Sequence, residues 1–240
     1  MIDSAQILYE DNHLLVLNKR SGQITQSDKT GDICMADEIR DFIRVRDDKP
    51  GNVFCGVVHR LDRPVSGVVI FAKTSKATTR LNNMIRTREV QKTYWALTKG
   101  VPPAPQGHLE NWLLRNEKQN KSFVVAEGTP MAKFASLDYR LLATSEGGYS
   151  LIEVDLHTGR HHQIRCQLAH IGCVIKGDLK YGAPRSNPDG SISLHARRIS
   201  LIHPVRKEPL EIVAPLPDDA LWQSFDGVGG NNQSSASVQE

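Results

Sequence analysis

Short apolar runs alternate with turn-forming residues over the first part of the chain. Residues 7–9 and 14–17 flank the polar tetrad 10–13, and this pattern predicts an opening β-hairpin. Apolar residues between positions 35 and 43 recur at the spacing of one helical face, which predicts an amphipathic helix. The β-branched run at 68–72 is too short for a helix and predicts a buried strand.

A second helix and a strand are predicted next. Ser75 can cap a helix with apolar residues on one face and arginines 80, 86 and 88 toward its end. From residue 90 to residue 98 the pattern changes to that of a strand. Because strand side chains alternate between faces, Lys92 and Tyr94 should point the same way.

Strand patterns outnumber helical ones in the rest of the chain. One helix is predicted to start at Thr158 or Gly159 and to stop at Gly172, and Pro217 can open a short final helix. Strands are predicted at 109–114, 122–125, 132–142, 149–156, 192–201 and 210–213. Consecutive strands with few helices predict an α+β fold around a central, largely antiparallel mixed sheet with flanking helices.

The proline-rich segment 102–107 cannot lie inside regular structure, so it is predicted to be a connection and a hinge between two lobes. Residues 1–226 are expected to form one domain. Residues 227–240 are rich in Gly, Asn, Ser and Gln without apolar periodicity, which predicts a disordered tail.

Composition narrows the class of protein. The chain has 240 residues, 39% hydrophobic and 24% charged, which is ordinary globular usage. No apolar run approaches a membrane span and no secretory signal opens the chain, so we expect a cytoplasmic protein without a membrane partner. The four cysteines lack the dense spacing of a disulfide scaffold, so we expect reduced thiols. We also expect a monomer.

Positive charge is concentrated in two stretches. Residues 57–100 and 159–207 each carry a net charge of +7, whereas the whole chain carries +3, which leaves −11 for the remainder. A basic face on an otherwise acidic protein is typical of a polyanion-binding protein. The charge pattern therefore predicts a nucleic-acid partner.

The strongest candidate for chemistry is Asp62, which stands between Arg60 and Arg63 with His59 close by in the sequence. Positive neighbours favour the charged form of a carboxylate, so Asp62 would be a nucleophile or a base at neutral pH. Local composition alone favours a surface ion-pair cluster instead, because such clusters are common.

Three ordered segments resemble the motifs of one family. Residues 59–67, HRLDRPVSG, resemble the H-R-L-D-x-x-T-S-G motif of the RluA family of RNA pseudouridine synthases. Residues 91–96, QKTYWA, and 158–165, TGRHHQIR, resemble its K-x-Y-x-A and T-G-R-x-H-Q-I-R motifs. The similarity extends over about residues 7–215 and includes closing segments at 177–178 and 194–196. Val65 departs from the usual threonine, which puts a local hydroxyl contact in doubt.

The resemblance implies an isomerase that converts uridine to pseudouridine in structured rRNA or tRNA, in a catalytic cleft between two lobes. It implies that Asp62 is the nucleophile and that Arg165 is its counter-charge. It also implies that Tyr94 stacks on the uracil and offers a hydroxyl to help remove the C5 proton of the reattached base. No metal, nucleotide or other cofactor is expected. The expected substrate-binding residues are His59, Arg60, Lys92, Arg160, Ile164 and Leu168.

Several of these roles have simpler alternatives. Arg60 is the candidate to fill the gap that a flipped base leaves, or it binds phosphate. Arg165 alone would be an exposed helix arginine and Tyr94 a half-buried strand tyrosine. Ile164 and Leu168 have the helical spacing of core residues.

Two other functions are compatible with parts of the sequence. A catalytically idle RNA-binding or chaperone protein would need only the basic face. A metal hydrolase would use Cys166, Cys173 and the histidines 157, 161, 162 and 170, but these lack the spacing of known zinc motifs. The loops 21–31 and 180–190 are the candidates for target selection.

Overall fold

A computed structural model describes residues 2–27 and 31–228. In chain order its elements are η1 (Ser4–Gln6), β1 (Ile7–Glu10), β2 (Leu14–Lys19), α1 (Met35–Arg46), β3 (Gly56–Val57), β4 (Ser66–Ala72), α2 (Ser75–Arg86), β5 (Gln91–Lys99), β6 (Gln106–Asn116), β7 (Lys121–Val125), β8 (Lys133–Thr144), β9 (Tyr149–Leu156), α3 (Gln163–His170), β10 (Val174–Ile175), η2 (Leu179–Tyr181), β11 (Leu194–Ile202), β12 (Pro209–Val213) and α4 (Ala220–Gln223).

The twelve strands of the described residues form one sheet, whose main path runs β1-β2-β4-β11-β5-β9-β8-β6-β7. The short strands β3, β12 and β10 pair with β4, β11 and β5. Among the described strands only β4 and β11 pair in parallel, and the other pairs are antiparallel. The α+β fold with a largely antiparallel mixed sheet is therefore confirmed.

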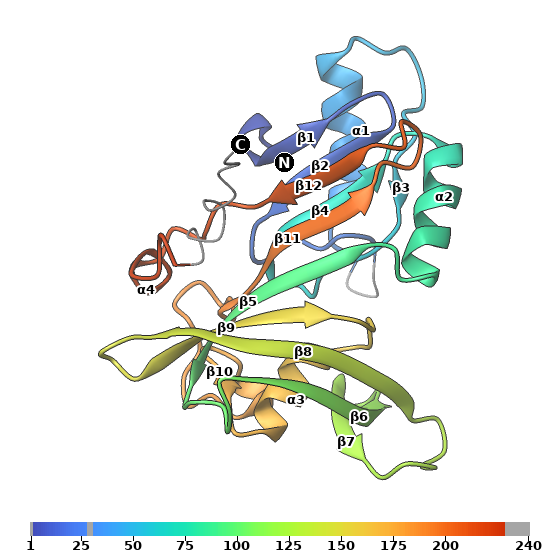
Figure 1. The fold of residues 1–240 in the computed structure, drawn as a ribbon. Helices are drawn as coiled ribbons and strands as arrows, with labels where there is room; N and C mark the ends of the chain where they lie inside the picture. The colour runs from blue at the N-terminus through green and yellow to red at the C-terminus, as the bar shows by residue number, and fades with distance from the viewer. Residues whose placement is uncertain (1, 28–30, 229–240) are drawn as a thin grey trace, which may run out of the picture.

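Both faces of the sheet are covered where β2 and β4 run side by side (Figure 1). Leu15 and Leu17 of β2 belong to the same buried cluster as Ile39 and Ile43 of α1. The alternate residues of β2, Leu14 and Val16, pack in a second cluster with residues of α2. This arrangement explains why β2 and β4 are almost continuously apolar, since each strand has two faces to bury.

The sheet joins two halves (Figure 1). The upper half holds β1, β2, β4, β11 and β12 with α1 and α2, and the lower half holds β6 to β9 with α3. β5 lies between them, because it pairs with β11 on one side and β9 on the other. The predicted hinge at 102–107 is wrong: residues 100–105 connect β5, the strand between the halves, with β6 of the lower half, and Gln106 and Gly107 already belong to β6.

Three helix starts differ from the prediction. The cap of α2 is Thr74, whose Oγ1 accepts a hydrogen bond from the Ala77 amide at 3.1 Å, and not Ser75. α3 starts at Gln163, later than expected, because the Gln163 side chain accepts from Thr158 Oγ1 at 2.8 Å and closes a turn. α4 is capped by Asp219 and does not begin with Pro217.

Other expectations have mixed outcomes. The four cysteines are free and buried. No helix in the described ranges is long and apolar enough to cross a membrane. The last two described residues, 227 and 228, lie in a turn, and the rest of the predicted disordered tail, 229–240, lies outside the described residues. The single-domain organisation stays a prediction.

Candidate active site

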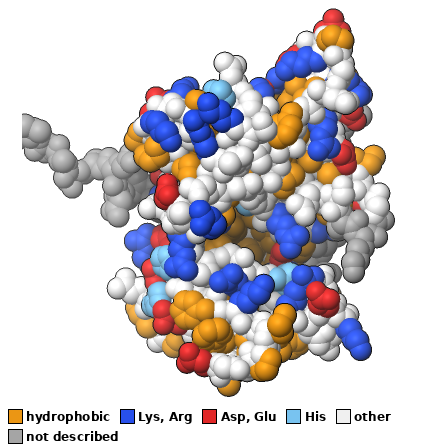
Figure 2. All heavy atoms as spheres, turned by 90° about the vertical axis from the view of Figure 1, so that its right-hand side faces the viewer, with side chains coloured by type: hydrophobic (Ala, Val, Ile, Leu, Met, Phe, Trp, Pro, Cys, Tyr) orange, Lys and Arg blue, Asp and Glu red, His pale blue; other side chains and the backbone are white. Residues whose placement is uncertain are grey.

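A cleft of about 1110 Å³ lies between the two halves. Figure 2 shows it as a hollow with Lys and Arg side chains around it. Its lining combines the loop before β4, the end of α2, strands β5, β8 and β9, and the start of α3. The arginines that line it come from both basic stretches of the sequence and are Arg60, Arg86, Arg88, Arg160, Arg165 and Arg198.

Asp62 lies in a tight loop that ends where β4 begins. The Val65 amide donates to the Asp62 carbonyl at 3.0 Å, which closes a turn. Lys19, fully buried at the end of β2, donates through Nζ to the carbonyls of Asp62, Arg63 and Val65 at 3.2, 3.0 and 2.6 Å. Burial lowers the pKa of Lys19 to about 7, and the charge of Asp62 opposes that shift. The lysine thus fixes the backbone that carries Asp62.

The glycine after this loop is required by the parallel pairing of β4 with β11. Gly67 has φ +113°, and a Cβ atom there would lie 2.3 Å from the Ala196 carbonyl oxygen. Only glycine permits both the dihedral angle and this close approach. Ser66 adds a side-chain contact to the same strand, because its Oγ lies 2.9 Å from Nδ1 of His195.

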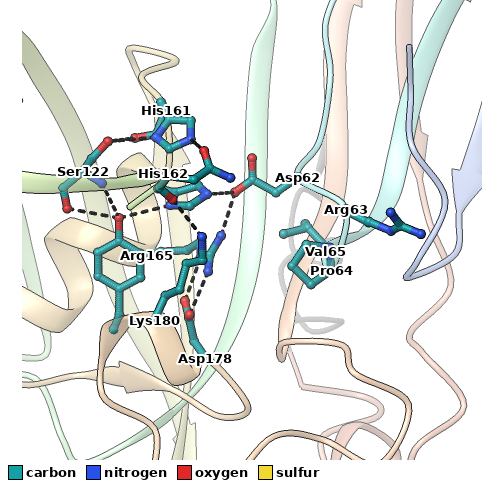
Figure 3. Close-up of polar contacts among 12 residues, drawn as sticks. Asp62, Arg63, Pro64, Val65, Ser122, His161, His162, Arg165, Asp178 and Lys180 are labelled. Atoms are coloured by element: carbon teal, nitrogen blue, oxygen red, sulfur yellow. Dashed lines mark hydrogen bonds and ion pairs between the residues drawn. The ribbon is translucent and has the colours of Figure 1, made fainter. Parts of the chain in front are cut away.

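Arg165 reaches Asp62 from the first turn of α3. Its Nη1 donates to Oδ2 of Asp62 at 3.1 Å, and its Nε and Nη2 donate to the two oxygens of Asp178 at 2.7 and 2.8 Å (Figure 3). Arg165 is 5% exposed and Asp178 is 1% exposed. The alternative of an exposed helix arginine is therefore wrong. A buried bidentate pair of this kind fixes the guanidinium in one orientation.

His162 stands on the other side of the same carboxylate oxygen. Its Nε2 lies 3.4 Å from Oδ2 of Asp62, and its Nδ1 lies 3.2 Å from the hydroxyl of Tyr181. His162 precedes α3 in the left-handed region, at φ +54°. Its ring is stacked on that of His161, with centroids 3.8 Å apart. Burial lowers the pKa of His162 to about 3, although the charge of Asp62 raises it, so the imidazole is neutral.

Tyr94 and Lys92 both line the cleft from β5. Tyr94 is 7% exposed. Burial, and then the charge of Asp62, raise the pKa of Tyr94 above its ordinary value, so its hydroxyl stays protonated at neutral pH. Burial also lowers the pKa of Lys92.

The other predicted binding residues separate into two groups. Arg60 and Arg160 are exposed in the cleft, and Ile164 lines it. His59 also lines the cleft, but its Nε2 accepts from the Ile70 amide at 2.9 Å, and burial lowers its pKa to about 3. His59 therefore adds no positive charge beside Asp62. Leu168 is fully buried in the core and does not line the cleft, so its predicted place in the pocket is wrong.

The expected candidates for a metal site do not come together. Within the described ranges one group of side chains has the spacing of metal ligands: His108, Asp138 and His157, all exposed at the wall of the cleft. Nδ1 of His108 lies 2.5 Å from Asp138 and its Nε2 lies 3.1 Å from Glu110. Hydrogen bonds to these two carboxylates raise the pKa of His108. An ion-pair network accounts for this group.

Four residues at the site were missed in the sequence: Lys19, His162, Asp178 and Tyr181. His162 and Asp178 lie inside segments that carry the family resemblance, so their position in a motif was a usable signal. Tyr181 follows Asp178 by three residues in a segment that we assigned to a loop. Lys19 gave a weaker signal, as a charged residue that ends an apolar strand.

Known proteins resemble this chain in sequence and in structure. The family model for RNA pseudouridylate synthase matches residues 13–170. Ribosomal large subunit pseudouridine synthase C of Buchnera aphidicola subsp. Schizaphis graminum is 33% identical over 229 residues, which cover 91% of this chain and 69% of that protein. tRNA pseudouridine synthase C of Pectobacterium carotovorum subsp. carotovorum is 32% identical, with 91% of this chain and 60% of that protein covered.

Among solved structures, Human RNA Pseudouridylate Synthase Domain Containing 4 superposes with a TM-score of 0.75 at 26% identity, covering 90% of each chain. The family model matches more than half of this chain, and the matched region contains Asp62, Tyr94 and Arg165. The motifs and the comparisons agree with the fold and with the basic cleft. This chain belongs to the RluA-type RNA pseudouridylate synthases.

Proposed function

We propose that this RNA pseudouridine synthase isomerises particular uridines in rRNA or tRNA, with Asp62 as the nucleophile. The observation that carries the proposal is the position of Asp62, in a basic cleft and within hydrogen-bond distance of a buried arginine. The names of the relatives support rRNA and tRNA as the substrate classes. A cytoplasmic, monomeric enzyme without a nucleotide cofactor stays a prediction.

The reaction calls for covalent catalysis and involves no redox chemistry. The bond between N1 of uracil and C1′ of ribose breaks, a bond between C5 and C1′ forms, the C5 proton leaves and N1 gains a proton. A carboxylate can add to the substrate and then leave, which divides a difficult step into two easier ones. Asp62 would supply this group, and Arg165 would be its fixed positive partner as RNA excludes water from the cleft.

Tyr94 would hold the uracil while it turns. Its ring lines the cleft and offers a flat surface for stacking. Because burial keeps its hydroxyl protonated, the empty site favours stacking and hydrogen-bond donation over the phenolate base that removal of the C5 proton would need. We therefore place Tyr94 as the stacking residue.

A uridine in folded RNA must leave its stack to reach Asp62. Arg60, exposed two residues before Asp62, would fill the gap or bind the adjacent phosphate. Lys92 and Arg160 would bind the backbone, and Ile164 would contact the base. His59 would support the loop through its bond to the Ile70 amide. The loop 180–190 remains a candidate for target selection.

The test uses RNA from cells that lack the gene. The protein is incubated with this RNA, and pseudouridine is mapped by carbodiimide-dependent stops of reverse transcription. We expect stops at specific positions for the wild type and none for Asp62→Asn, with RNA affinity largely kept. The matched control is Asp11→Asn, which changes an aspartate outside the cleft lining and should keep every stop.

Two results would overturn the proposal. One is a wild-type protein that produces no stop in rRNA or tRNA but still binds RNA, which is the behaviour of an idle RNA-binding protein. The other is unchanged modification by Asp62→Asn. The comparisons with relatives named as pseudouridine synthases do not favour the idle protein.

A further inference from the structure

The contacts at Asp62 converge on one of its two carboxylate oxygens. Arg165 Nη1 lies 3.1 Å from Oδ2, and His162 Nε2 lies 3.4 Å from the same atom (Figure 3). Among the residues that the structure describes, no donor is within hydrogen-bond distance of Oδ1. One oxygen is thus held while the other is left for the substrate.

The position of one proton decides what His162 offers to Asp62. A neutral imidazole carries its proton on Nδ1 or on Nε2. With the proton on Nε2, the ring donates toward Oδ2. With the proton on Nδ1, a lone pair on Nε2 would face a carboxylate oxygen, which is repulsive. The group that faces Nδ1 therefore controls the hydrogen bond at the other side of the ring.

Tyr181 is that group, and its proton has two acceptors within reach, the Ser122 carbonyl and Nδ1 of His162. The Tyr181 hydroxyl accepts from the Ser122 amide at 2.9 Å. Its own proton can go to the Ser122 carbonyl at 3.1 Å or to Nδ1 of His162 at 3.2 Å. The Ser122 carbonyl has a second donor, the Cys166 thiol at 3.3 Å, so it does not depend on Tyr181. Burial raises the pKa of Tyr181, so the hydroxyl keeps its proton.

The rings are held in place around these contacts. His161 stacks on His162, and the Tyr181 ring meets the His162 ring edge-on with centroids 5.7 Å apart. The guanidinium of Arg165 lies over the Tyr181 ring at 5.2 Å. Tyr181 therefore contacts both groups that hold Oδ2. The 3.4 Å separation between His162 and Asp62 is long, as is common for catalytic contacts before substrate binds.

We infer that Tyr181 and His162 form a hydrogen-bond relay that, with Arg165, holds Oδ2 of Asp62 and leaves Oδ1 as the attacking oxygen. This inference rests on the proposed nucleophilic role of Asp62. As Oδ1 forms its bond to C1′ of the ribose, the bond between C1′ and N1 breaks and uracil takes its electron pair, while Oδ2 becomes the carbonyl oxygen of the ester and keeps its two donors. When C5 of uracil then bonds to C1′, the bond between Oδ1 and C1′ breaks and its electron pair returns to the carboxylate, which Arg165 and His162 stabilise. Tyr181 and His162 are positioning residues.

Turnover of designed variants tests the relay. The assay measures the tritium that is released from C5 of uridine. Its substrate is tritium-labelled RNA from cells that lack the gene. His162→Ala should lower kcat by about tenfold to a hundredfold with little change in KM, because a hydrogen bond to a charged group is lost. His162→Gln should recover part of the loss, since its amide can donate to Oδ2. Tyr181→Phe should lower kcat by about tenfold and keep the ring against Arg165.

The double variant separates a relay from two independent structural roles. If Tyr181 acts through His162, adding Tyr181→Phe to His162→Ala should cause no further loss of kcat. Independent effects would multiply and would overturn the inference. Matched controls come from a second aspartate, Asp11, which a tyrosine and a histidine also contact. Tyr9→Phe and His203→Gln should change stability and leave kcat unaltered.

A second measurement does not depend on turnover. Nitrogen NMR of histidine-labelled protein should report the proton of His162 on Nε2 in the wild type, and a shift toward Nδ1 in Tyr181→Phe. A wild-type proton on Nδ1 would overturn the relay even in an active enzyme. An inactive wild type with the Nε2 proton would instead contradict the proposed function alone. Melting temperatures of all variants identify losses that come from unfolding.

Discussion

Asp11 and Asp62 both lie near a tyrosine, a histidine and an arginine, but their carboxylates contact these groups differently. Asp11, in the turn between β1 and β2, accepts from the amides of His13 and Leu14 through Oδ1 at 2.7 and 2.8 Å. Its Oδ2 accepts from Tyr9 at 2.9 Å and lies 2.9 Å from Nε2 of His203. Among the described residues, both oxygens of Asp11 have donors within reach, whereas for Asp62 only Oδ2 has. This difference agrees with a structural role for Asp11 and with the proposed nucleophilic role of Asp62.

The two loops are stabilised in opposite ways. Asp11 bonds to the backbone of its own turn, so the carboxylate itself maintains the local structure. The loop of Asp62 is held by Lys19, which binds the carbonyls of the loop and leaves the carboxylate available. The two side chains also differ in exposure: that of Asp62 is 32% exposed and that of Asp11 is 16% exposed.

The largest expected effect comes from removing the arginine at Asp62. Arg165→Met leaves the carboxylate of Asp178 buried without its partner, which should lower the free energy of unfolding by about 3–5 kcal/mol. It also removes a donor from Oδ2, which should lower kcat by about a hundredfold or more. Urea unfolding and the tritium assay measure the two quantities.

The matched change at the other aspartate is Arg206→Met. Arg206 is 45% exposed and lies 3.5 Å from Asp11, so its loss should cost less than about 1 kcal/mol and no activity. Adding Asp178→Asn to Arg165→Met should recover stability but not kcat. Full recovery of kcat in that double variant would show that Arg165 acts only through folding.

The next largest effect should come from Lys19. Lys19→Met removes the donor to the carbonyls of Asp62, Arg63 and Val65, so the free energy of unfolding should fall by about 2–3 kcal/mol. The loop that carries Asp62 would then shift, and kcat should fall by about tenfold or more. A stability loss with unchanged kcat would contradict the view that Lys19 holds the loop of Asp62 in place for catalysis.

A smaller effect is expected for Asp11→Asn. The amide oxygen can still accept from the His13 and Leu14 amides, but the charged contacts to Tyr9 and His203 are weakened. The free energy of unfolding should fall by about 1–2 kcal/mol, and kcat should stay the same. A change in kcat beyond twofold would place Asp11 among the groups that affect catalysis.

The smallest expected effect is a dependence of folding stability on pH. Burial raises the pKa of Asp11, but the amides of His13 and Leu14 and the Tyr9 hydroxyl outweigh burial, so the pKa lies below its ordinary value. A lowered pKa in the folded state stabilises the fold above the unfolded value near 3.8, and this contribution is lost as pH falls through the folded value. The stability difference between wild type and Asp11→Asn should therefore be constant above about pH 5 and shrink below pH 4. A difference that grows on acidification would contradict the shift.

Sequence periodicity was a good guide where an element buries a regular face. The opening hairpin, α1 and the strands from β5 to β9 follow from the alternation of apolar and polar residues. Helix starts were less predictable, because Thr158 and Gln163 form a side-chain turn that competes with the helix. The 102–107 segment failed as a hinge because proline marks a connection without telling which parts it connects.

The residues of the site could be predicted only where they lie in a recognisable sequence motif. Asp62, Tyr94 and Arg165 line one cleft, although nothing local distinguishes Arg165 from an exposed arginine. Ile164 and Leu168 have the same helical pattern, yet only Ile164 lines the cleft, since the helix exposes one edge of its apolar face. The contacts of Tyr181 depend on packing between distant segments, which no local pattern encodes.

The close approach of Gly67 to Ala196 also bears on how the enzyme is made. The strand that starts at the end of the loop carrying Asp62 has its parallel partner 129 positions later, at His195. Such distant pairing is slow to form, because a long stretch of chain must be ordered before the contact is made. During synthesis, the hairpin of β1 and β2 can fold early, while the cleft is completed only after β11 leaves the ribosome. Incomplete chains would thus bear Asp62 without the strand that completes the cleft.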